Sequence, residues 1–169
     1  MKEYNSLNNN KKYKILFVCL GNICRSAAAE EVMRVMAARA GRGDEFEIDS
    51  AGLIDYHEGE LPDARMRRHA RQRGYELTHR SRPVRPADFA RFDLLLAMDR
   101  SNVEGLLRLA RTETERRKVV RLADYLQSHD TDTIPDPYYG GPEGFELVLD
   151  LLEDACGGLL RAIPAVKNI

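Results

Sequence analysis

One cysteine and one arginine near the start of the chain have types and spacing that could do chemistry. Five residues separate Cys19 from Arg25, and Ser26 follows where its hydroxyl can hydrogen-bond the cysteine sulfur. A thiol held beside an arginine and a helix N-terminus ionises readily, because both favour the thiolate. An arginine also offers a planar, two-pronged donor for an oxyanion. The set therefore predicts a nucleophile beside a bound oxyanion, most naturally phosphate.

The segments around these residues are those that would build an anion site. Residues 15–18 are apolar and predict a buried strand, while the alanine-rich residues 27–31 predict a helix. The link between them must wrap tightly, and Gly21 and Asn22 are best able to take unusual backbone angles. Such a loop turns several backbone N–H groups toward one point. The alternative is a buried structural cysteine with a surface arginine.

A second candidate for chemistry is Asp136. Displacing a phosphoryl group from an oxygen requires a proton for the leaving alcohol. Pro135 and Pro137 flank this aspartate and stiffen its loop, and Tyr138 and Tyr139 could wall a pocket for a flat ring. The alternative is that Asp-Pro only forms a turn.

The rest of the chain predicts one α/β domain. Apolar strands alternate with helices, which implies a parallel sheet with helices on both faces and a ligand site at the carboxyl ends of the strands. Residues 77–86 are expected to be irregular and 88–92 to form a single helical turn. The strands are expected at 15–19, 46–50, 93–98 and 119–122, and the longer helices at 26–40, 63–73, 103–109 and 142–163.

Composition bounds the class of protein. The 169 residues suggest one domain at 13–169, preceded by a flexible extension at 1–12. A net charge of −1 argues against general binding to nucleic acid or membrane. We expect no membrane span and no signal peptide, and hence a cytoplasmic protein. The three cysteines are too few for a disulfide framework and fit a reducing compartment.

The motifs together resemble the low-molecular-weight protein tyrosine phosphatases, over residues 14 to 160. The likeness is carried, in the same order, by residues 18–26, 50–52, 62–65, 79 with 81–82, 98–102 and 136–140. The resemblance implies a flavodoxin-like three-layer sandwich with a four-stranded parallel sheet. It also implies that the partners are tyrosine-phosphorylated proteins, a bacterial tyrosine kinase among them. The sequence does not predict an oligomeric state.

The resemblance also implies roles for individual residues. Cys19 would be the nucleophile that forms a phosphocysteine, Arg25 the phosphate clamp and Asp136 the general acid, without metal or cofactor. Asn22, Ser26 and His79 would form the hydrogen-bond network that shapes the loop. The residues expected to contact substrate are Leu20, Gly21, Asn22, Ile23, Cys24, Ser26, Tyr138 and Tyr139.

Cys24 and the arginine-rich segment have two interpretations each, whereas Cys156 has one. Cys24 is either a redox partner for Cys19 or a small residue that fits the loop. Cys156 lies on an apolar helical stripe and is expected in the core. The nine arginines from 65 to 91 form either a solvated face or a surface for acidic phosphoproteins. Zinc would need two ligands besides Cys19 and Cys24, and the histidines show no paired spacing.

Three other activities compete with tyrosine phosphatase. A thiol-dependent arsenate reductase would need a relay of further cysteines, and only Cys156 is left. A protein-arginine phosphatase would, by resemblance, carry threonine at Ile23 and lack the second tyrosine of Tyr138-Tyr139. A phosphocysteine carrier protein would have no use for Asp136.

Overall fold

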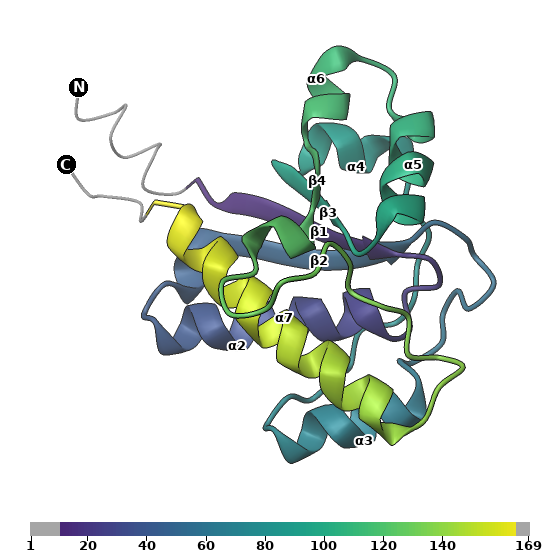
Figure 1. Cartoon of the computed structure of the whole chain (residues 1–169). Coiled ribbons are helices and arrows are strands. Elements are labelled where there is room, and N and C mark those ends of the chain that lie inside the picture. Colours follow the sequence, from purple (N-terminus) through teal and green to yellow (C-terminus); the bar gives the residue numbers. More distant parts are fainter. Residues whose placement is uncertain (1–10, 165–169) are drawn as a thin grey trace.

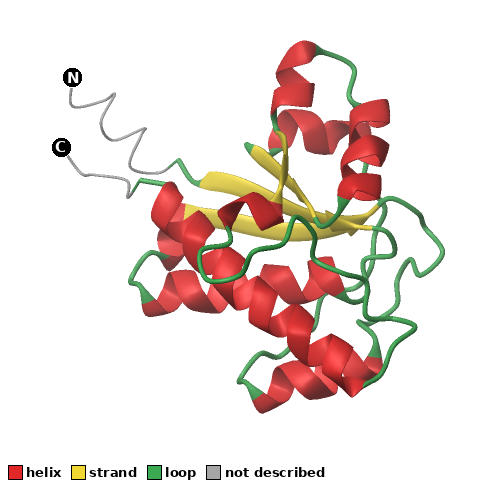
Figure 2. Ribbon diagram, in the orientation of Figure 1, coloured by secondary structure: helices red, strands yellow, loops and turns green. Residues whose placement is uncertain are grey.

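The structure is a computed structural model, and it describes residues 11–164. Four parallel strands form one sheet in the order β2-β1-β3-β4, with helices on both sides of it (Figures 1 and 2). The strands are β1 (Tyr13–Cys19), β2 (Phe46–Gly52), β3 (Leu94–Ala97) and β4 (Val119–Arg121). The prediction of an α/β fold with a four-stranded parallel sheet is confirmed.

The helices form one layer on each face of the sheet. The helices are α2 (Arg25–Arg39), α3 (Ala64–Gln72), α4 (Pro86–Arg91), α5 (Arg100–Leu109), α6 (Glu113–Arg117) and α7 (Pro142–Ala162), with short 3-10 turns η1 (Gly43–Glu45) and η2 (Leu122–Tyr125). Helices α2, α3 and α7 gather on one side, and α4, α5 and α6 on the other (Figure 1). Strand β1 is therefore covered on both faces.

The alternation of side chains along β1 divides the core in two. Ile15 and Phe17 point into the cluster under α2 and α7, while Leu16 and Val18 point into the cluster under α4 and α5. All four side chains are fully buried. Their burial is the physical reason that this run has no polar residue.

Three helices differ from the sequence prediction. Helix α4 starts at Pro86, inside the segment expected to be irregular, because proline suits a first helical position. Helix α5 starts at Arg100, since the Asp99 carboxylate accepts from the backbone N–H of Asn102 at 2.8 Å. Helix α6 was not predicted; its five polar residues carry no apolar period, and Thr112 caps it.

Two predictions concern the chain as a whole. The extension at 1–12 lies almost wholly outside the described residues, so it stays a prediction. Within residues 11–164, none of the helices has the length and apolar character to cross a bilayer.

Helix α7 packs so closely on η2 that one of its positions admits only glycine. A Cβ added to Gly158 would lie 1.9 Å from the carbonyl oxygen of Tyr125, which is backbone and cannot rotate away. The neighbouring Gly157 faces the flexible end of Met36, where an added Cβ would lie 3.3 Å from Cε. Two adjacent glycines of one helix thus meet different surroundings.

This difference predicts opposite effects of the same substitution. Gly158→Ala is expected to lower the free energy of unfolding by roughly 1–3 kcal/mol, because α7 must shift away from η2. Gly157→Ala, the matched control, is expected to be neutral or stabilising by up to about 1 kcal/mol, the gain in helix propensity. Urea unfolding of both variants measures the difference; equal stabilities would contradict this account of the packing.

Candidate active site

A tight loop links the end of β1 to the start of α2. We call residues 19–25 the phosphate loop. Cys19 is the last residue of β1, as predicted, and Arg25 is the first residue of α2, one position before the expected start of that helix. Within the described residues, the backbone N–H groups of Leu20 to Cys24 have no protein acceptor. The loop can therefore donate these N–H groups to a bound anion.

Asn22 takes the unusual backbone angle of this loop. Its φ is 57°, in the left-handed region, and it is the only non-glycine residue with positive φ in the part of the chain that the structure describes. Gly21, expected to share this role, does not have a positive φ. A glycine at this position instead leaves room for the His57 ring, since a Cβ on Gly21 would lie 3.2 Å from His57 Cδ2.

The buried side chain of Asn22 holds the phosphate loop from behind. Its Nδ2 donates to Ser26 Oγ at 2.8 Å and to Ser50 Oγ at 3.0 Å. Its Oδ1 accepts from His79 Nε2 at 3.0 Å and from the backbone N–H of Arg82 at 3.1 Å. Every hydrogen-bonding site of this amide is thus used on the side away from the cavity.

Cys19 and Ser26 meet at the floor of the site. The sulfur lies 3.0 Å from Ser26 Oγ, and Cys19 is 3% exposed. Ser26 is fully buried, and its hydroxyl also accepts from Asn22. Because that contact uses the hydroxyl oxygen as acceptor, the hydroxyl hydrogen is free to point at the sulfur.

Arg25 connects the phosphate loop to the ends of two other segments. Its Nη1 donates to Asp99 Oδ2 at 2.6 Å and to the carbonyl oxygen of Ile134 at 3.1 Å. Its Nη2 lies 3.7 Å from Asp136 Oδ2. Arg25 is only 3% exposed, and the two carboxylates that balance its charge are partly exposed, Asp99 at 27% and Asp136 at 41%.

Asp136 reaches the cavity from the loop before α7. Ile134 donates its backbone N–H to the carbonyl of Met98 at 2.8 Å, which ties this loop to the end of β3. Asp136 Oδ1 accepts from the backbone N–H of Tyr138 at 3.0 Å. The side chain is 41% exposed, so Asp136 lies at the rim between solvent and Arg25.

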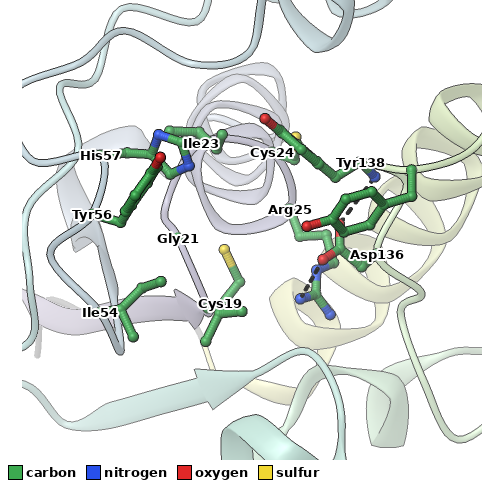
Figure 3. A pocket seen from close by; sticks show the side chains of 12 residues that line it. Cys19, Gly21, Ile23, Cys24, Arg25, Ile54, Tyr56, His57, Asp136 and Tyr138 are labelled. Carbon is green, nitrogen blue, oxygen red and sulfur yellow. Dashed lines mark hydrogen bonds and ion pairs between the residues drawn. The ribbon is translucent and has the colours of Figure 1, made fainter.

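The cavity has a volume of about 370 Å³ and two aromatic sides. Tyr138 and Tyr139 line one side; Tyr139 is 92% exposed and forms the outer rim. Ile54, Tyr56 and His57 line the other side (Figure 3). Figure 3 also shows the Cys19 sulfur between Tyr56 on one side and Tyr138 on the other. The floor is small and polar, and the walls suit a flat ring.

Most predicted contact residues line this cavity, and two do not. The residues that line it as predicted are Cys19, Leu20, Gly21, Ile23, Cys24, Arg25, Asp136, Tyr138 and Tyr139. Asn22 and Ser26 are fully buried behind the phosphate loop, so they support the loop and do not line the cavity. His79 also lies on that side, through its bond to Asn22.

Four residues of the site were not predicted from the sequence. Ile54, Tyr56 and His57 follow the carboxyl end of β2, and Asp99 follows that of β3. Ligands of parallel sheets bind at the carboxyl ends of strands. Applied to every strand, and not only to the first, that rule would have pointed to these residues.

The other two cysteines are buried thiols. Burial raises the pKa of Cys24 well above its ordinary value, and the Asp63 carboxylate raises it further. Cys156 is fully buried, as predicted, and burial raises its pKa too. All three cysteines are free in this structure.

One group of three possible metal ligands occurs in residues 11–164. Atoms of Glu30, Asp49 and His79 lie within 4.8 Å of one another. Glu30 also pairs with Arg34 at 2.9 Å, and Asp49 with Arg82 at 3.0 Å. These guanidinium groups already neutralise the carboxylates, so ion pairing accounts for the group.

The arginine-rich segment is mostly bonded within the protein. Seven of its nine arginines make a side-chain hydrogen bond: Arg65, Arg67, Arg71, Arg73, Arg80, Arg82 and Arg91. Arg82 bridges Asp49 and Asp88. These contacts favour a solvated face with internal ion pairs over a docking surface.

Comparison with known proteins gives consistent matches over nearly the whole chain. The family model for low molecular weight phosphotyrosine protein phosphatase matches residues 14–168. A low molecular weight protein-tyrosine-phosphatase of Streptomyces coelicolor is 44% identical over 154 residues, which cover 89% of this chain and 93% of the relative.

Solved structures agree. The crystal structure of an Entamoeba histolytica protein tyrosine phosphatase, with Hepes in the active site, has a TM-score of 0.86 at 45% identity, over 89% of this chain and 96% of that one. The structure of a Drosophila arginine phosphatase has a TM-score of 0.84 at 30% identity, over 91% and 99%. With a family match across the domain and a relative at 44% identity, the chain belongs to the low molecular weight phosphotyrosine protein phosphatase family.

Proposed function

We propose that this phosphatase hydrolyses phosphotyrosine in proteins, and simple aryl phosphates, through a phosphocysteine on Cys19. One observation carries the proposal: a thiol, a buried guanidinium and a carboxyl group line a single cavity whose loop N–H groups have no protein acceptor. Cys19, Arg25 and Asp136 are the residues concerned.

In the first step, the Cys19 thiolate attacks phosphorus and the bond from phosphorus to the tyrosine oxygen breaks. Asp136 gives its proton to the leaving oxygen, so a neutral phenol departs. Arg25 and the loop N–H groups hold the phosphoryl oxygens while charge spreads over them. Ser26 donates to the sulfur, 3.0 Å away, and supports the thiolate.

In the second step, water attacks the phosphocysteine. Asp136 now accepts a proton from that water, and the sulfur leaves as a thiolate. Inorganic phosphate then departs from the loop. The same carboxyl group thus serves as acid and then as base, which its place at the rim, 41% exposed, allows.

The shape of the cavity favours an aryl substrate over the alternatives. Tyr56 and Tyr138 lie on opposite sides of the cavity, and the side chain of Ile23, which also lines it, is aliphatic (Figure 3). An arsenate reductase relay would need further reactive cysteines beyond the phosphate loop, and the one cysteine outside that loop, Cys156, is fully buried. A carrier protein would gain nothing from an acid such as Asp136.

Replacement of the nucleophile tests the proposal directly. Cys19→Ser is expected to abolish hydrolysis of p-nitrophenyl phosphate, because a hydroxyl does not ionise near neutral pH as a thiol can. Circular dichroism and a thermal melt are expected to match wild type, since serine is nearly isosteric. Turnover retained by purified Cys19→Ser would exclude the phosphocysteine mechanism.

The role of Asp136 predicts a dependence on the leaving group. The reaction needs thiolate Cys19 together with protonated Asp136, so the rate is expected to be bell-shaped in pH. Asp136→Asn is expected to reduce kcat for phenyl phosphates with poor leaving groups by about 10²–10⁴-fold, and for good leaving groups far less. A leaving-group series measures this, and equal losses across it would remove Asp136 from the role.

Cys24 is proposed as a protector of Cys19 against oxidation. Peroxide converts the Cys19 thiolate to a sulfenic acid; attack by Cys24 then forms a disulfide and releases water. The attacking species is a thiolate, and the pKa of Cys24 is raised by burial and Asp63. Ring closure is therefore expected to speed up as pH rises.

The measurement is the activity recovered with dithiothreitol after graded peroxide. Wild type is expected to recover most of its activity. Cys24→Ser is expected to recover less, because its Cys19 proceeds to sulfinic acid, which thiols do not reduce. Equal recovery would leave Cys24 as only a small residue that fits the loop.

A further inference from the structure

His57 has a fixed place at the mouth of the cavity that the mechanism above does not use. Its ring packs on the phosphate loop, where a Cβ on Gly21 would come within 3.2 Å of Cδ2. Only 17% of its side chain is exposed. Figure 3 shows the ring beside Ile23 and Tyr56, on the side of the mouth opposite Tyr138.

Hydrogen bonding determines which nitrogen of this ring faces the mouth. Nδ1 lies 3.0 Å from Glu60 Oε1, so Nδ1 carries a hydrogen and donates to the carboxylate. In the neutral ring the lone pair is then on Nε2, and protonation puts a new N–H there. Within residues 11–164 Nε2 has no hydrogen-bond partner, and it is not sealed from solvent.

The other basic group of the cavity cannot serve a second anion. Of the described residues that line the cavity, Arg25 and His57 are the ones that can carry positive charge. Arg25 is bonded to Asp99 and Ile134, and in the proposed mechanism it holds the phosphate. His57 alone offers a cation at the rim of this lining.

We infer that His57 is a specificity-determining residue: its protonated ring favours phosphotyrosine that has an aspartate or glutamate as the adjacent residue. The acidic side chain would accept from Nε2 while the phosphate occupies the loop. This inference rests on the proposed tyrosine phosphatase activity, and it adds the class of phosphopeptide.

Several charged or titratable groups face His57. On its own loop, Glu60 holds Nδ1 and the Tyr56 ring lies edge-on, with ring centroids 4.8 Å apart. The phosphate loop contributes Cys19, and the loop before α7 contributes Asp136 and the Tyr138 ring, whose centroid lies 6.4 Å from that of His57. The two carboxylates and a bound phosphate attract a cationic ring. The preference is therefore expected to grow as pH falls.

The test uses pairs of phosphotyrosine peptides that differ only in Glu or Gln next to the phosphotyrosine, one pair for the preceding and one for the following position. The measured quantity is the ratio of kcat/KM for the two members, from about pH 8 to about pH 5, where imidazole titrates. Titration of Cys19, Asp136 and the phosphate cancels in this ratio. We expect the ratio to rise about two- to five-fold in one pair, the effect of an exposed ion pair.

Two variants assign the effect to His57. His57→Gln is expected to give a ratio that does not change with pH, and His57→Lys a ratio that stays high throughout. A flat ratio in wild type, or a wild-type rise kept by His57→Gln, would overturn the inference. Absence of turnover of every phosphotyrosine peptide by wild type would instead overturn the proposed function.

Discussion

The hydrogen bonds of Asn22 are the constraint on which the site depends. A left-handed backbone costs a non-glycine residue roughly 1–2 kcal/mol, and this loop has that conformation at φ 57°. Four bonds to Ser26, Ser50, His79 and the backbone of Arg82 offset it, each contributing about 0.5–1.5 kcal/mol. They come from three separate segments of the chain. These bonds stabilise the conformation of the phosphate loop and leave its backbone N–H groups without a protein acceptor among the described residues.

Arg25 connects the phosphate loop with the loop that carries Asp136, the proposed general acid. The guanidinium reaches Asp99 after β3 and the carbonyl of Ile134, two residues before Asp136. The group proposed to hold phosphate is thus bonded to the loop that carries the proposed acid. These bonds therefore tie the loop before α7 to the phosphate loop and to the end of β3.

The parts of this protein that local sequence pattern determines were predicted correctly. The apolar run before Cys19 could only be a buried strand, and the loop and helix after it followed from Arg25 and the alanines. Helix α6 was not predicted, because its five polar residues have no apolar face. The cavity walls Ile54, Tyr56 and His57 were not predicted either. Those three residues have no shared period or motif. They become neighbours of Cys19 only because β2 and β1 are parallel and end at the same edge, a tertiary fact.

The late position of α7 in the chain has a consequence during synthesis. Ile15 and Phe17 belong to the same core cluster as Phe145 and Leu152 of α7, more than a hundred residues further on. A ribosome delivers the sheet and α2 first, so this face of the sheet is only partly covered until α7 leaves the exit tunnel. The thiol, the loop and the arginine are all made early, but the core that keeps β1 and α2 in place is not. The nascent chain therefore carries the proposed nucleophile on a domain whose core stays incomplete until α7 is made.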